Sequence, residues 1–173
     1  MSIRPVLLFG DPRLRQKAAE VTLESGTWRG DAEDLADTLR DLKARLGFGR
    51  ALAAPQIGSP HRLIAFACPL GSFVAVNPRI LWRSPELVPI WDDCFSLPGT
   101  AMAVMRHRSV SFECHDVAGK RLSFEAVEPT HAELVQHEVD HLDGILMVDR
   151  LVEPTAVIAR QMAAVTPHPR AAG

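Results

Sequence analysis

The sequence predicts an α+β fold in which antiparallel strands surround a central helix. A stripe of leucines predicts one early helix, several short strand patterns follow it, and a second helical pattern comes late in the chain. The strands are grouped instead of alternating one by one with helices, which favours an antiparallel arrangement over a doubly wound parallel sheet. The 173 residues show no break in composition, so we expect a single domain over residues 1–173, with a loose tail after about residue 155.

Composition and charge are typical of an ordinary globular protein. Hydrophobic residues make up 47% of the chain and charged residues 23%, which argues against wholesale disorder. The formal net charge of −2 excludes a strongly basic nucleic-acid binder, so no DNA partner is expected. The longest uncharged run, residues 63–78, is shorter than the ~20 residues of a membrane helix, so no membrane partner is expected. Three cysteines cannot all pair and no leader pattern opens the chain, which indicates a reduced, cytoplasmic compartment.

The early helix is predicted from Asp31 to a stop at Gly47. Four leucines recur at spacings of four, three and four, which places them on one helical face: Leu35, Leu39, Leu42 and Leu46. Acidic residues lie near the start of this segment and basic residues near its end, as the helix dipole favours.

The middle of the chain predicts strands. Residues 49–58 are too rich in proline, glycine and small residues for a regular helix. Five short segments with strand character follow: residues 62–68, 73–77, 101–105, 109–115 and 121–127. In the fourth of these, apolar and polar residues alternate, which is typical of a half-buried strand.

The late helix is predicted to open at Pro129 and to end near Gly144. Thr130 followed three residues later by Glu133 has the pattern of a capping box. A further short helix is predicted over residues 155–165.

The late helix carries the strongest chemical signal of the sequence. His137 and His141 are four residues apart, so both imidazoles lie on one helical face and can bind one metal ion. Glu138 between them is the type of residue that accepts a proton from a water molecule beside the metal. The competing interpretation is a pair of surface histidines on an amphipathic helix. The sequence therefore predicts that the central helix of the fold is metal-binding.

A catalytic metal usually needs a third protein ligand and an open position. Met147 stands where a metzincin would have its third histidine, and Glu153 lies beside a proline, a poor place for a ligand-bearing helix. Cys94 is the better candidate, in a strand-edge or turn context. Cys68 and Cys114 lie in apolar or alternating segments and are interpreted as buried small hydrophobic residues.

Three separated segments resemble the three motifs of the peptide deformylases, in the order of that family. Residues 49–56, Gly-Arg-Ala-Leu-Ala-Ala-Pro-Gln, are similar to the first motif. Residues 92–96, Asp-Asp-Cys-Phe-Ser, are similar to the second motif, Glu-Gly-Cys-Leu-Ser. Residues 136–142, Gln-His-Glu-Val-Asp-His-Leu, match the third motif without substitution. The likeness extends over roughly residues 3–151 and implies a peptide deformylase-like fold.

The resemblance also implies an activity, a cofactor and the roles of individual residues. The activity is hydrolysis of a linear amide, with removal of the N-formyl group from N-formylmethionyl nascent peptides and release of formate. The cofactor is one divalent metal ion, with Fe²⁺ favoured over Zn²⁺, Ni²⁺ or Co²⁺. Its ligands would be Cys94, His137 and His141. Glu138 would act as general base and then acid, while Gln56 and the backbone N–H of Phe95 would hold the oxyanion.

Several residues near the motifs depart from the family pattern and bring the substrate pocket into question. Ala51 replaces a glycine, which either fits without strain or brings a costly Cβ. Asp92 and Asp93 replace Glu-Gly, and Arg106 could pair with one of these acids. Glu133 either caps the helix or places a carboxylate, which would favour a cation, in the pocket that the family uses for a methionine side chain. The predicted pocket residues are Gly49, Ala51, Leu52, Asp93, Glu133 and Leu134.

Two further functions stay open from the sequence. One is hydrolysis of another N-formyl or N-acyl amine by a deformylase-like enzyme, and the other is a metal-binding homologue without turnover. The basic triplet at residues 106–108 is interpreted as a solvated edge, although it could contact an RNA or ribosomal surface, such as that near the exit tunnel.

Overall fold

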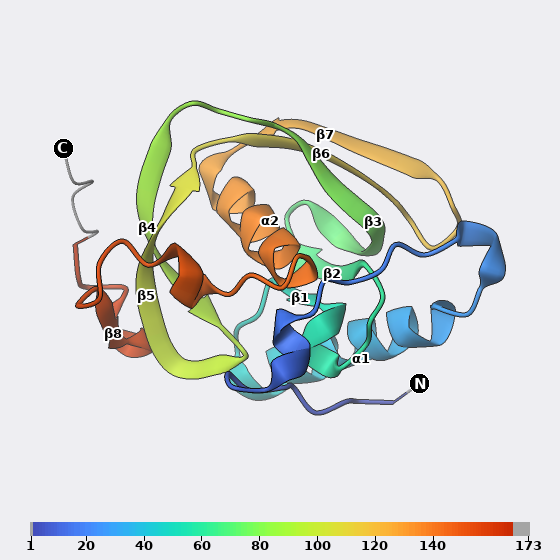
Figure 1. The fold of residues 1–173 in the computed structure, drawn as a ribbon, viewed down its shortest axis with the longest axis horizontal. Coiled ribbons are helices and arrows are strands. Elements are labelled where there is room, and N and C mark those ends of the chain that lie inside the picture. Colours follow the sequence, from blue (N-terminus) through green and yellow to red (C-terminus); the bar gives the residue numbers. More distant parts are fainter. Residues whose placement is uncertain (1, 168–173) are drawn as a thin grey trace.

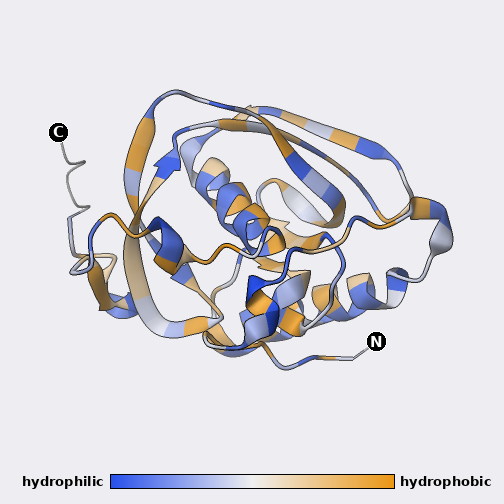
Figure 2. Cartoon of the chain, viewed as in Figure 1, coloured by the Kyte–Doolittle hydropathy of each residue, from blue (hydrophilic) through white to orange (hydrophobic). Residues whose placement is uncertain are grey.

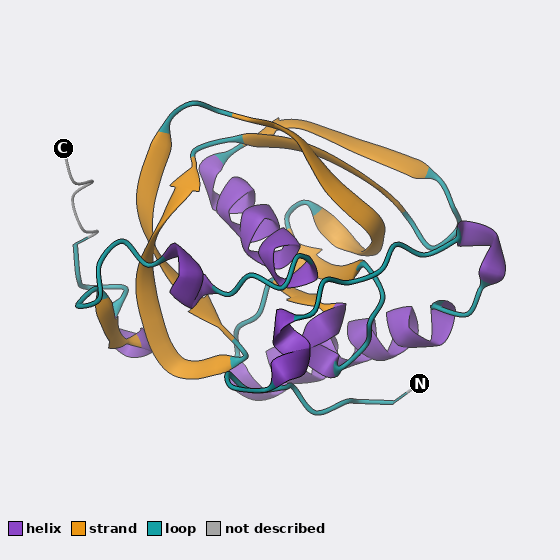
Figure 3. Cartoon of the chain, in the orientation of Figure 1, coloured by secondary structure: helices purple, strands orange, loops and turns teal. Residues whose placement is uncertain are grey.

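The computed structural model describes residues 2–167 and confirms the α+β fold. A long helix lies at one side of the molecule and a second helix lies in its centre, enclosed by strands (Figures 1 and 3). The strands form two sheets in which every pairing is antiparallel. None of the helices in residues 2–167 is both long and apolar enough to cross a membrane.

The larger sheet has the strand order β1-β2-β3-β6-β7. Its strands are β1 (Ala51–Ala53), β2 (Leu63–Cys68), β3 (Gly71–Arg83), β6 (Val110–His115) and β7 (Arg121–Val127). All but β1 were predicted, although β3 extends well beyond residues 73–77. The sheet therefore supplies the scaffold on which both helices pack.

The two helices cover opposite faces of the first three strands. Helix α1 (Arg29–Leu46) packs its leucine stripe on the face that carries Leu52, and helix α2 (Pro129–Leu142) packs on the face that carries Ala51. Successive residues of a strand point to opposite faces, which explains why these neighbours enter different cores. Figure 2 shows hydrophobic and hydrophilic residues interleaved along α1, as expected for a helix with one buried face.

The smaller sheet has the order β4-β5-β8 and lies beside α2. Its strands are β4 (Leu87–Cys94), β5 (Leu97–His107) and β8 (Val157–Ala159). A tight turn joins β4 to β5, so that Cys94 pairs with Leu97 at the end of the hairpin. This turn brings Cys94 toward the helix that carries the two histidines.

Two predicted features of the helices are wrong. Residues 155–165 are not a helix, because Val157–Ala159 pair with β5 and only a short 3₁₀ turn, Arg160–Met162, follows. The described part of the tail is therefore packed against the body. The capping box is also absent, since α2 begins after Glu128 without a side-chain cap and Glu133 bonds to Arg50 instead.

Candidate metal centre

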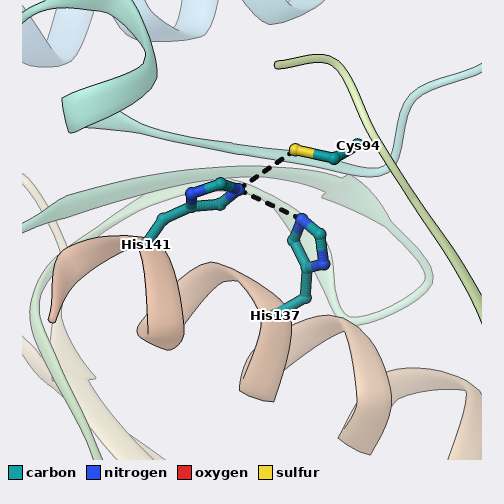
Figure 4. A group of neighbouring side chains, drawn as sticks. All are labelled: Cys94, His137 and His141. Atoms are coloured by element: carbon teal, nitrogen blue, oxygen red, sulfur yellow. Dashed lines mark hydrogen bonds between the residues drawn. The ribbon is translucent and has the colours of Figure 1, made fainter. Parts of the chain in front are cut away.

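Three buried donor atoms converge between β4 and α2. Cys94 ends β4, and His137 and His141 lie one turn apart on α2 with their rings facing Cys94 (Figure 4). The Sγ of Cys94 is 3.2 Å from the Nε2 of His141, which is 3.2 Å from the Nε2 of His137. All three donor atoms lie within 4.8 Å of one another. The predicted ligand set is thus brought together in space.

The geometry of this cluster suits a divalent metal ion. Nitrogens held 2.0–2.1 Å from a tetrahedral ion lie about 3.4 Å apart, and a thiolate sulfur lies slightly farther from each nitrogen. The two distances of 3.2 Å are close to that spacing. One thiolate and two imidazoles are also donors that zinc and iron accept. Cys94, His137 and His141 therefore fit the metal that the motif implies.

Asp92 orients His137 from the opposite side of the ring. The Nδ1 of His137 lies 2.9 Å from a carboxylate oxygen of Asp92, which leaves Nε2 directed at the cluster. Burial lowers the pKa of His137, but the Asp92 carboxylate outweighs burial and holds this pKa well above its usual value. Arg106 donates to the same carboxylate at 2.9 Å, which confirms the expected pairing of Arg106 with one of the acids.

His141 has the opposite electrostatic environment. Burial, followed by the positive charge of His137, holds the pKa of His141 well below its usual value. A neutral imidazole keeps the lone pair that metal coordination requires. Its Nδ1 is buried and has no hydrogen-bond partner among residues 2–167.

Glu138 lies on the same face of α2 and lines the adjoining pocket. Burial raises the pKa of its carboxyl to about 7, and its Oε2 has no partner among the described residues. A carboxyl group with a pKa near neutrality can both accept and return a proton. The position therefore suits the general base that the motif predicts.

Gln56 is held beside the cluster by its own amide oxygen. Its Oε1 accepts from the backbone N–H of Ala53 at 2.9 Å, and this bond turns Nε2 toward Cys94 and Ser96. The Nε2 lies 3.5 Å from the Sγ of Cys94 and 3.2 Å from the Oγ of Ser96. Phe95 follows Cys94 in the turn, and its ring stacks on Phe48. The amide of Gln56 therefore lies beside the metal cluster, and Phe95 lines the same cavity as Gln56 and Cys94.

A cavity of about 300 Å³ opens onto the cluster. Five of the six predicted pocket residues line it: Gly49, Ala51, Asp93, Glu133 and Leu134. Leu52 is the exception, because strand alternation turns its fully buried side chain into the core against α1. The expectation for Leu52 is therefore corrected, while Ala51, its neighbour in β1, faces the pocket.

The glycine replacements cause no visible backbone conflict. Ala51 pairs with Phe66 in the sheet, and neither Ala51 nor Asp93 has a positive φ. The demanding position is Gly49, with a φ of 128°, where a Cβ would lie 2.8 Å from the ring of Phe95. Of the two interpretations of Ala51, the geometry supports the one in which alanine fits without strain.

Two arginines that the sequence analysis did not select line the pocket. Arg160 forms an ion pair with Asp93, and its guanidinium lies 3.5 Å from the centre of the Phe48 ring. Arg50 bonds the Thr130 carbonyl at 2.8 Å and forms an ion pair with Glu133. No local pattern marks either arginine, because each is brought to the pocket by contacts between distant segments.

The basic triplet is not a solvated edge throughout. Arg106 is 3% exposed and lies between Asp92 and Asp140. Only Arg108 of the triplet is exposed, and it lies near Glu86. Burial of Arg106 removes it from any contact surface.

Comparison with known proteins agrees with this geometry. The family model for polypeptide deformylases matches residues 3–156. A peptide deformylase of Dictyoglomus thermophilum is 35% identical over 88% of this chain and 95% of its own, and a peptide deformylase-like protein of Bradyrhizobium diazoefficiens is 37% identical over 87% and 86%. The crystal structure of a peptide deformylase from Legionella pneumophila superposes with a TM-score of 0.78 and 34% identity, covering 95% of this chain and 92% of that one. A match over most of the length, with relatives above 30% identity, places this chain in the polypeptide deformylase family.

Proposed function

We propose that this protein hydrolyses the formamide bond of N-formylated peptides, with N-formylmethionyl nascent chains as substrates. The convergence of Cys94, His137 and His141 beside Glu138, in a member of the deformylase family, carries this proposal. Water adds to the formyl carbon, the bond between that carbon and the amine nitrogen breaks, and formate and a free amino terminus result.

The protein's own groups provide the proton transfers. A bound divalent ion would polarise the formyl carbonyl and lower the pKa of water. Glu138 accepts the proton of the attacking water and returns it to the departing amine nitrogen. The pKa of about 7 suits both steps, because the carboxyl group is then neither a very weak base nor a very weak acid near neutral pH.

Gln56 and Phe95 would stabilise the negative charge on the formyl oxygen. The Nε2 of Gln56 is already aimed at the cluster, since Ala53 holds the other end of the amide at 2.9 Å. A donor fixed before the reaction needs no reorganisation, and removing one such donor costs roughly 10²–10³ in rate. The backbone N–H of Phe95, next to Cys94, is the second donor in this proposal.

The metal and the cellular setting are also part of the proposal. We assign Fe²⁺, because the chain resembles a family of iron(II)-type hydrolases and a thiolate with two imidazoles suits it, with Zn²⁺, Ni²⁺ or Co²⁺ as alternatives. Residues 1–173 form one catalytic domain that works in the cytoplasm, where nascent chains emerge near the ribosomal exit tunnel. The substrate, not DNA or a membrane, is the partner.

The test is release of formate. Protein loaded anaerobically with Fe²⁺, or with Ni²⁺, is incubated with formyl-Met-Ala, and formate and free amine are measured together. Equal amounts of both products support the proposal. Stoichiometric metal with no turnover on any formyl peptide contradicts it and favours the homologue that binds metal without catalysis.

A second candidate is hydrolysis of a different N-formyl amine. It is favoured by the two ion pairs on the pocket wall, Arg50–Glu133 and Asp93–Arg160. Activity on other formylated amines, with little on formyl-Met-Ala, would select this candidate.

A further inference from the structure

We propose that Arg160 is a positioning residue of the candidate active site, which holds the turn after β4 in the place that the reaction requires. It does so through two contacts, an ion pair with Asp93 and a cation–π contact with Phe48. This inference rests on the proposed function and deepens it, because it adds a residue of the C-terminal segment to the groups around Cys94. The role is indirect, since Arg160 acts on the turn and not on the reacting atoms.

Arg160 reaches the pocket from a segment that lies beyond the family match. The model of the polypeptide deformylases matches residues 3–156. Arg160 follows β8, which is added to the edge of β5 through the pairing of Ala159 with Thr100 and of the two residues before it. Its partner Asp93 stands where the second motif of the family has glycine. The ion pair therefore joins a residue that departs from the motif to a residue outside the matched region.

The cation–π contact is part of a stack on the wall of the pocket. The guanidinium carbon of Arg160 lies 3.5 Å from the centre of the Phe48 ring. That ring lies 5.6 Å from the ring of Phe95, and the angle between the two planes is 13°. All three residues line the cavity of about 300 Å³ beside the metal cluster. Because a cation is attracted to the face of an aromatic ring, Arg160 holds Phe48, and Phe48 in turn holds Phe95.

The two contacts of Arg160 act on both sides of Cys94 in the sequence. Asp93 precedes Cys94 and pairs with Arg160 directly. Phe95 follows Cys94, and its ring is held through Phe48. The turn that carries the sulfur of Cys94 is therefore tied to the C-terminal segment before and after this residue.

The same turn carries the backbone N–H of Phe95, which we propose as an oxyanion donor. Such a donor is effective when it is held in place before the reaction, so that no reorganisation is needed as the charge develops. A small displacement of a positioned group lowers the rate even when the group itself is retained. Loss of the contacts of Arg160 should therefore lower the rate of the chemical step.

These contacts should contribute little to the stability of the whole protein. The side chains of Arg160 and Asp93 are 36% and 37% exposed. Ion pairs between exposed side chains contribute little to folding, because water solvates both charges and the side chains lose freedom when they pair. A change in rate without a change in stability is thus the signature of the positioning role.

The experiment compares the native protein with Arg160→Leu, whose side chain can neither pair with Asp93 nor act as a cation on Phe48. Both proteins are loaded with Ni²⁺, and kcat and KM for formyl-Met-Ala are determined separately. Phe48→Leu and the double variant complete a cycle that tests whether the two residues act together. Arg45→Leu is the matched control, because it removes a guanidinium whose Nε pairs with an aspartate on α1, away from the cavity.

We expect Arg160→Leu to lower kcat about tenfold and to leave KM within about twofold of the native value, since a contact that matters in the transition state alone lowers kcat and kcat/KM equally. The double variant should lose no more than the more affected single variant, because both changes release the same turn. Arg45→Leu should retain the native kcat. Native kcat in Arg160→Leu would overturn the inference. A rise in KM at unchanged kcat would do the same, because Arg160 would then bind the substrate itself, and so would losses that multiply in the double variant.

Hydrogen exchange separates this inference from the proposed function, because it requires no turnover. Amide exchange of the Ni²⁺-loaded native protein and Arg160→Leu is measured by mass spectrometry of their peptides. Faster exchange confined to residues 47–51 and 93–97, with an unchanged urea midpoint, supports the inference even if the native protein releases no formate. Native exchange in both segments overturns it, and so does faster exchange throughout the protein, which would show a role in global stability.

Discussion

The two faces of helix α2 carry adjacent residues of one motif and serve different purposes. His137 and Glu138 line the pocket, and His141 joins His137 and Cys94 in the metal cluster. Two buried polar atoms on this side, Oε2 of Glu138 and Nδ1 of His141, have no hydrogen-bond partner among the described residues. Gln136 and Asp140 face the other way, and their side chains are engaged by the protein itself. Within the seven residues of this motif, one face of the helix carries the candidate catalytic groups and the other face holds the helix in place.

The anchoring face ties α2 to the smaller sheet. Gln136 accepts from the backbone N–H of His107 at 2.9 Å and donates to its carbonyl at 2.8 Å, as a neighbouring strand would. Asp140 forms ion pairs with Arg106 and Arg150. These bonds fix the rotation of α2 about its axis, and that rotation aims the opposite face at Cys94.

Asp92 and Arg106 connect the two faces. Asp92 holds the Nδ1 of His137 and pairs with Arg106, which also pairs with Asp140. Burial raises the pKa of Asp92, but His137 and then Arg106 outweigh it and hold this pKa below its usual value. We therefore expect substitutions on the pocket face of α2 to lower the rate of hydrolysis, and substitutions on its anchoring face to lower the free energy of unfolding.

The largest expected effect is on the catalytic face. Glu138→Gln should lower kcat by about 10²–10⁴-fold, because it removes the proton acceptor. Metal content and the unfolding midpoint should stay near the native values, since Glu138 is not among the three clustered donors. Steady-state formate release and metal analysis provide the two measurements. A variant with the native rate would show that the proton-transfer role is misassigned.

Substitutions among the residues that anchor α2 should lower the stability of the protein. Arg106→Met removes a 3%-exposed guanidinium from two carboxylates, and breaking a buried pair in this way costs about 3–5 kcal/mol. Urea unfolding measures the loss. Arg108→Met is the matched control, because the side chain of Arg108 is 53% exposed and its loss should change stability by less than about 0.5 kcal/mol. Equal losses in both variants would contradict the anchoring role of Arg106.

Local sequence patterns predicted the parts of the molecule that depend on neighbouring residues. The leucine stripe of α1 and the spacing of His137 and His141 follow from helical periodicity alone. Strand β4 was missed, because Pro89 and two aspartates interrupt its alternation, and its pairing with β5 outweighs that weak pattern. A helix was wrongly predicted where Val157–Ala159 add to the edge of β5.

In the candidate site, too, local patterns predicted some residues, while others depend on contacts between distant segments. Cys94 was found by its motif, although only the β4–β5 turn brings it to the histidines. Arg50 and Arg160 were missed because their partners, Glu133 and Asp93, are 83 and 67 residues away. Leu52 was misplaced, because the face of a strand residue depends on sheet packing that no local pattern shows.

The smallest predicted effect lies at the connection between the faces. Asp92→Asn retains an oxygen that can accept from His137 but removes the negative charge, and loss of such a partner typically lowers metal affinity about 10–100-fold. Competition with a chelator measures this affinity. Asp93→Asn is the neighbouring control, since Asp93 bonds Arg160 and not a ligand, and its affinity should stay native. If both variants lose affinity equally, the negative charge around Cys94 matters and the bond to His137 does not. If only Asp92→Asn loses it, the two faces of α2 are coupled through one carboxylate.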